Sequence, residues 1–206
     1  MKNKTIKRTI VFAVLLCLTA VLFGFAAFAA ECAEIRNEVL RLHVLANSDT
    51  EADQSLKLKV RDAVIAEADG LLDGIDDKES AMGAVKKALP RLREAAQNCV
   101  YEQGYGYTVK AELCDMYFTT REYDTGTLPA GVYAALRITI GKGVGHNWWC
   151  VVYPSMCLPA AEGSAQWSDV LDDTQTDIVE HPERYEVRLK VVEWVQQLWQ
   201  YLESLW

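Results

Sequence analysis

The sequence predicts an α+β fold in which helices come first and a small, mainly antiparallel sheet follows. Apolar residues recur at helical spacing over 51–68 and 77–100, whereas runs rich in β-branched and aromatic residues cluster between 107 and 153. The two kinds of segment do not alternate regularly, which argues against a parallel α/β sheet. Because half of the 206 residues are hydrophobic, the chain is long enough for one domain with a substantial core.

We expect four parts along the chain. They are a signal peptide or N-terminal membrane anchor (1–30), a globular α+β domain (31–157), an acidic linker (158–182) and a C-terminal amphipathic helix (183–206).

The first thirty residues have the pattern of an export signal. Four basic residues precede a continuous apolar run at 10–30, and no acidic residue occurs before Glu31. We favour cleavage after Ala29 or Ala30, because small residues stand where a signal peptidase needs them. The run is also long enough to be an uncleaved anchor, in which case 10–30 would be the only membrane contact. In both cases the charges place the rest of the chain outside the cytoplasm.

The charge balance excludes some classes of partner. The formal net charge is −8, and it becomes −12 without residues 1–30, which carry four basic residues and no acidic one. A domain of this charge should repel nucleic acid and anionic membrane surfaces.

Two helices are expected at the start of the globular part. Ser48 with Glu51 forms a capping box, which predicts a helix over 48–68. A second helix should span 77–89, where Pro90 breaks or kinks it before helical spacing resumes.

Four segments have strand character, and a polar connection at 119–127 separates the second from the third. They are 35–45 (which could begin as helix), 107–118, 132–140 and 148–153.

The last fifty residues differ from the rest. Acidic residues are frequent and large apolar ones few over 158–182, so a flexible linker is the simplest interpretation. The helix over 183–206 has an apolar stripe and mixed charges. We therefore expect it to dock on a protein, its own domain or a partner, and not on a membrane surface.

The strongest candidate for a binding site is the segment after three closely spaced glycines. Adjacent residues on a strand point to opposite faces, so one of Trp148 and Trp149 should face the core and the other should lie on the opposite face, where it could contact a partner. We take His146, Asn147, Trp148 and Trp149 as the candidate partner-binding residues. Asn47, Ser48 and Asp49 form a polar cluster at a helix start, where a structural role is the better explanation.

The cysteines suggest disulfides and not catalysis. Cys150 and Cys157 flank a plausible turn, and export permits a disulfide between them, although two buried thiols remain an alternative. Cys99 and Cys114 form a weaker candidate pair. His146 and Cys150 could form a catalytic pair only through a bend, because a spacing of four on a strand separates them by about 13 Å. The spacing of His and Cys fits no metal site, and no cofactor motif is present.

Two segments resemble the stage II sporulation protein R family of endospore-forming bacteria. They are LHVLANSDTEADQSLKLKVRDAV (42–64) and LPAGVYAALRITIGKGVGHNWWCVVYPSMC (128–157). The resemblance implies a non-enzymatic signalling protein, made in the forespore and exported into the space between forespore and mother cell. Its implied partner is the membrane-embedded aspartic protease of the mother cell, which processes pro-sigma-E. The rival interpretation is a secreted hydrolase that uses Cys150 and His146, or a metal.

Overall fold

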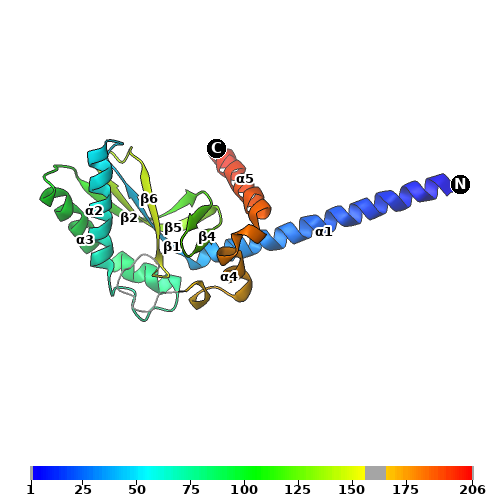
Figure 1. Cartoon of the computed structure of the whole chain (residues 1–206), viewed down its shortest axis with the longest axis horizontal. Coiled ribbons are helices and arrows are strands. Elements are labelled where there is room, and N and C mark those ends of the chain that lie inside the picture. Colours follow the sequence, from blue (N-terminus) through cyan, green and yellow to red (C-terminus); the bar gives the residue numbers. More distant parts are fainter. Residues whose placement is uncertain (1, 156–165, 206) are drawn as a thin grey trace.

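A four-stranded sheet lies between two layers of helices in the computed structural model, which describes residues 2–155 and 166–205 (Figure 1). Helices α2 (Glu51–Ala68) and α3 (Lys78–Glu102) cover one face. The C-terminal end of α1 (Lys2–Glu38) and helices α4 (Asp173–Glu180) and α5 (Glu186–Glu203) lie on the other side. The predicted α+β class is confirmed.

The sheet has the strand order β2-β5-β1-β6. The strands are β1 (Leu40–Leu45), β2 (Val109–Phe118), β5 (Gly131–Ile140) and β6 (Asn147–Tyr153). The outer pairs β2–β5 and β1–β6 are antiparallel, as expected. The central pair β1–β5 is parallel, so the sheet is mixed. Parallel neighbours need a long crossover, and here α2, α3 and β2 supply it.

The helical layer formed by α2 and α3 corrects two expectations. The N-cap of α2 is Thr50, whose side chain accepts a hydrogen bond from the Asp53 backbone, so the Ser48 capping box does not form. Helix α3 continues through Pro90 without ending. Its buried positions on either side of the proline, Ala88 and Leu92, keep the four-residue spacing, so one continuous face packs on the sheet.

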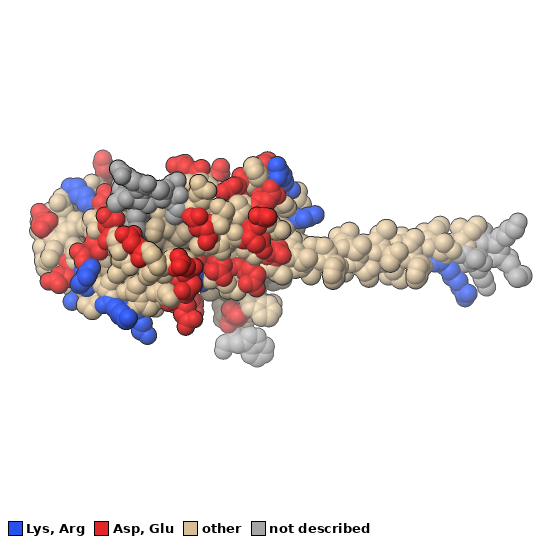
Figure 2. All heavy atoms as spheres, turned by 90° about the horizontal axis from the view of Figure 1, so that it is seen from below, with Lys and Arg blue, Asp and Glu red and all other residues tan. Residues whose placement is uncertain are grey.

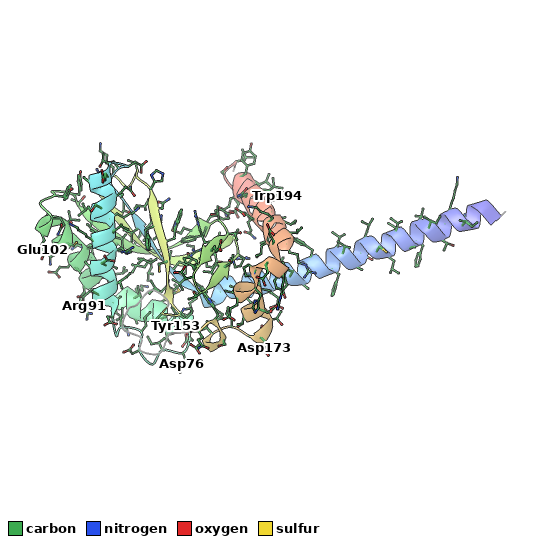
Figure 3. The ribbon with its side chains drawn as sticks, in the orientation of Figure 1. Asp76, Arg91, Glu102, Tyr153, Asp173 and Trp194 are labelled. Carbon is green, nitrogen blue, oxygen red and sulfur yellow. The ribbon has the colours of Figure 1, made fainter. Side chains whose placement is uncertain are left out.

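Helix α1 passes unbroken from the apolar N-terminal run into the core. Beyond the body its side chains project into open space (Figure 3). Near its C-terminal end, Phe28 is only 4% exposed, and Cys32 and Ile35 are fully buried. The Phe28 ring stacks on Tyr185 with centroids 5.5 Å apart. The core therefore includes a residue that lies before the predicted cleavage site.

Part of the predicted acidic linker is folded. A short 3-10 turn (Trp167–Asp169) and α4 occupy the described part of 158–182. Trp167, Ile178 and Val179 are buried beside α1. The acidic side chains hid this pattern because they occupy the solvent side of the same segment. Residues 156–165 lie outside the described part of the chain.

The predicted polar connection at 119–127 is also structured. It forms a hairpin of two short strands, β3 (Arg121–Tyr123) and β4 (Gly126–Leu128). Both strands have three residues, too few for alternation to be visible in the sequence. The Trp167 indole donates a hydrogen bond to the Thr125 carbonyl at 2.7 Å, which ties this hairpin to the C-terminal part.

The C-terminal helix docks on its own domain through one end only. Leu189 and Val192 are buried in the layer that contains α1. Further along α5, Trp194 (labelled in Figure 3), Leu198 and Trp199 are each about 60% exposed. The predicted amphipathic helix therefore forms, and it leaves a broad apolar surface uncovered.

Candidate interaction site

Hydrogen bonds connect the loop that follows β1 to the loop that follows β5. The Gly145 backbone amide donates to the Ala46 carbonyl at 3.0 Å, and the Lys142 amide donates to the Asn47 side chain at 3.0 Å. Asp49 accepts hydrogen bonds from the backbone and the ring of His146, both at 2.5 Å. A Cβ atom at Gly145 would collide with the Ser48 carbonyl, so glycine is needed for this close approach.

This junction explains the polar cluster at the helix start. Asn47 and Ser48 both donate to the Asp53 carboxylate, at 2.8 and 2.5 Å, which holds the turn before α2. Hydrogen bonds from His146 lower the pKa of Asp49. The structural interpretation of Asn47, Ser48 and Asp49 accounts for these contacts, and His146 belongs to the same junction.

The two adjacent tryptophans of β6 point to opposite faces of the sheet, as the strand geometry predicts. Trp148 packs against the α2–α3 layer, with the Arg61 guanidinium 4.3 Å from its ring centroid. Trp149 packs on the other face, with the Arg121 guanidinium 3.7 Å from its ring centroid. Neither ring is fully buried, because β6 is an edge strand of the sheet.

His43 connects Trp149 to the core. Its ring is 4% exposed and stacks on Trp149 with centroids 6.1 Å apart. One ring nitrogen, Nε2, lies 2.9 Å from the Asn147 side-chain oxygen. Because burial disfavours the charged form, the pKa of His43 is lowered from its ordinary value. The neutral tautomer with its proton on Nε2 fits this hydrogen bond.

A cavity of about 490 Å³ lies between the β3–β4 hairpin and β6, and we call it the hairpin pocket. Its walls are residues 121–125 of the hairpin and 147–151 of the edge strand. Three of the four predicted partner-binding residues, Asn147, Trp148 and Trp149, line it.

The sequence interpretation missed the other side of this pocket. Arg121 and Tyr123 lie in the segment expected to be a polar connection, and the Tyr123 hydroxyl accepts a hydrogen bond from Arg41 of β1. The sequence of β1 did contain a pattern that could have indicated this side of the pocket. The run LRLHVL alternates apolar with polar residues, which places Arg41 and His43 together on one face of a strand.

The cysteines do not offer a catalytic thiol at the candidate site. Cys150 is disulfide-bonded, so it has no free sulfur to act as a nucleophile. Its predicted partner, Cys157, lies outside the described residues, and this pairing stays a prediction. Cys99 and Cys114 are free thiols, so the second predicted pair is wrong: the two lie on separate elements, α3 and β2. Within 2–155 and 166–205, no group of three His, Cys, Asp or Glu residues could hold a metal ion.

The surface of the body is strongly acidic. Figure 2 shows Asp and Glu side chains spread over the visible face, whereas α1 beyond the body is almost uncharged except near its N-terminal end. Within the described part of the chain, one helix is long and apolar enough to cross a membrane, and a signal sequence would pass the same test. The fold and the site therefore define an acidic α+β domain that follows a signal-type or membrane-spanning helix and carries a pocket lined in part by aromatic side chains.

Comparisons with known proteins agree with this class. The family model for stage II sporulation protein R matches residues 36–162. Stage II sporulation protein R of Bacillus subtilis (strain 168) is 31% identical over 185 residues, which cover 80% of this chain and 83% of the relative. No solved structure matches the chain. The chain belongs to the stage II sporulation protein R family, and this membership supports a role in sporulation.

Proposed function

We propose that this protein is an exported sporulation signal, which activates the mother-cell membrane aspartic protease that processes pro-sigma-E. The observation that carries the proposal is membership of the stage II sporulation protein R family. The basic residues before the apolar part of α1 are consistent with export of the body into the space between forespore and mother cell.

The signal acts by protein contact and not by catalysis on this account. The hydrolase alternative needs a thiolate at Cys150, and the disulfide at that position leaves none. The half-buried aromatic side chains of the hairpin pocket and the exposed ones of α5 provide surfaces of the composition that protein interfaces favour.

We further propose that α1 is retained as an anchor in the forespore membrane. Cleavage after Ala29 or Ala30 would remove Phe28, which is almost completely buried against Tyr185. The folded body would then have a cavity in its core, at a cost of about 3–5 kcal/mol for a lost phenylalanine side chain. Retention of the helix avoids this cost and keeps the signal at the septum.

The topology can be tested in cells that contain the protease and pro-sigma-E but no other sporulation signal. Three forms are compared: the full chain, residues 25–206 in the cytoplasm, and residues 25–206 behind an unrelated signal peptide. This truncation keeps Phe28, so the three forms share the same core. We expect precursor processing with both exported forms and none with the cytoplasmic form. Equal processing by the cytoplasmic form would refute the proposed topology.

A further inference from the structure

Among the described residues, an arginine without an ion-pair partner is buried next to the hairpin pocket. Arg41 is fully buried, and its Nη2 atom donates to the Tyr123 hydroxyl. Its Nε and Nη1 atoms are buried without a hydrogen-bond partner. Aromatic rings surround the guanidinium: its central carbon lies 3.9 Å from the Phe118 centroid and 4.9 Å from the Tyr133 centroid. None of the ion pairs between described residues includes Arg41.

A second unpaired cation forms the wall of the pocket itself. Arg121 stacks on Trp149 and makes no ion pair with a described residue, and its Nε atom is buried without a partner. Arg121 is close enough to Arg41 to lower the pKa of the Arg41 guanidinium, after the larger effects of burial and of the two nearby tyrosines. The adjacent acids Glu122 and Asp124 also line the pocket, but both are exposed to solvent, and neither forms an ion pair with Arg121.

This arrangement is costly without an anion. Removal of a charge from water is strongly unfavourable unless an opposite charge or hydrogen bonds compensate, and an arginine does not lose its proton to avoid this penalty. The chain has 29 acidic and 21 basic residues, yet none of the described acids pairs with either arginine. A bound anion would accept hydrogen bonds from Arg121, which lines the pocket, and would offset part of the positive charge of the neighbouring Arg41.

We propose that the hairpin pocket binds a carboxylate side chain on an exposed segment of the protein partner. The acidic surface of the body disfavours a polyanion such as nucleic acid or an anionic membrane, whereas one aspartate or glutamate can enter between the rings (Figure 2). Arginine with tryptophan and tyrosine is also the composition of energetically dominant positions in protein interfaces. The identity of the partner rests on the proposed function, but binding of a carboxylate does not.

The carboxylate site can be tested on the full chain in neutral detergent micelles. The probe is an acetylated and amidated peptide of four glutamates, and the matched peptide of four glutamines is the control. Trp149 forms part of the pocket wall, so binding can be followed by tryptophan fluorescence. The compared variants are Arg121→Gln, Arg121→Lys and Arg91→Gln. Arg91 is an exposed arginine on α3 that pairs with Glu67 and does not line the pocket.

We expect saturable binding of the glutamate peptide and much weaker binding of the glutamine peptide. Arg121→Gln should weaken binding by about 10- to 100-fold, since it removes a charge-assisted hydrogen bond. Arg121→Lys should have an intermediate effect, and Arg91→Gln should bind like the native chain. Equal binding of the two peptides, no binding by the native chain, or full binding by a folded Arg121→Gln variant would overturn the proposal. If Arg121→Gln does not fold, the affinity of Arg121→Lys for the glutamate peptide tests the proposal instead. This variant keeps the charge but loses the planar stacking of the guanidinium.

The same variants separate this inference from the proposed function. In the processing assay, Arg121→Gln should lose activity and Arg91→Gln should keep it. Peptide binding through Arg121 with normal processing by Arg121→Gln would overturn the assignment of the carboxylate to the signalling partner. Failure of the native chain to promote processing would instead contradict the proposed function. The peptide titration would still show whether the hairpin pocket binds a carboxylate.

Discussion

Replacement of Arg41 by methionine should leave the fold at least as stable as before. Methionine keeps most of the apolar stem and can contact the same rings. The change removes two buried nitrogen atoms without acceptors, each of which costs about 1–3 kcal/mol. It also removes the hydrogen bond to Tyr123 and two close cation–π contacts, which contribute about 0.5–2 kcal/mol each.

These contributions nearly cancel. The sign of the change in the free energy of unfolding then depends on the desolvation of the Arg41 charge, which the substitution removes. We expect the free energy of unfolding of Arg41→Met to be unchanged or to rise by up to about 2 kcal/mol, while signalling falls. Urea denaturation of the full chain in micelles, followed by circular dichroism, measures the first quantity, and the processing assay measures the second.

Arg61→Met is the matched control for this prediction. Arg61 also covers a tryptophan, but it pairs with Asp62 at 2.6 Å, so its loss should cost up to about 1 kcal/mol. A loss of about 3 kcal/mol or more in Arg41→Met would show that Arg41 stabilises the fold as a satisfied buried group. Arg41 would then not be an uncompensated buried charge.

Three further predictions concern the rest of the core. Burial lowers the pKa of His43 from 6.5, so the unfolded chain takes up its proton first as pH falls, and the free energy of unfolding should decrease below about pH 6.5. Denaturation at several pH values should show this decrease in the native chain, and His43→Gln should lose the contribution; an unchanged slope in the variant would contradict the assignment. Phe28 should remain in the mature protein, and Phe28→Ala should lower the free energy of unfolding by about 3–5 kcal/mol; mass spectrometry of membrane fractions that finds only chains lacking residues 1–30 would disprove retention. Cys150 and Cys157 should be linked, contributing about 2 kcal/mol for so small a loop, and two free thiols in unreduced peptides would end this prediction.

The sequence predicted the strands of the main sheet well. Segments such as 132–140 are rich in β-branched and aromatic residues and are bounded by glycines, and the observed strand differs by one residue at its start. Local composition was decisive for 132–140 because β5 lies in the middle of the sheet and is largely buried on both faces.

Local signals failed where distant contacts determine the structure. Pro90 was expected to break or kink the helix, but the buried face that includes Ala88 and Leu92 packs on the sheet on both sides of the proline, and α3 is not interrupted. The β3–β4 hairpin and α4 were missed because each depends on packing against other elements, as Trp167 shows by its hydrogen bond to Thr125. A fold with such contacts could not be derived from periodicity alone.

The candidate site was only half predictable for the same reason. Trp149 and its neighbours stood out in the sequence, and the structure places them along the pocket. Arg41 and Arg121 are 80 positions apart and come together only when the hairpin folds over β1. Neither arginine forms an ion pair with an acid of the described residues, which is a property of the tertiary structure that no sequence pattern indicates.

The most direct test of the central claim is reconstitution of signalling with purified components. The membrane protease is inserted in liposomes with pro-sigma-E on its cytoplasmic side, and the full chain is delivered in separate liposomes that expose its body to the outer face. We predict that the precursor is cleaved only when the native chain is present on that face, and that Arg121→Gln fails where Arg91→Gln succeeds. Cleavage at the same rate without the chain, or with the chain only on the cytoplasmic side, would contradict the account.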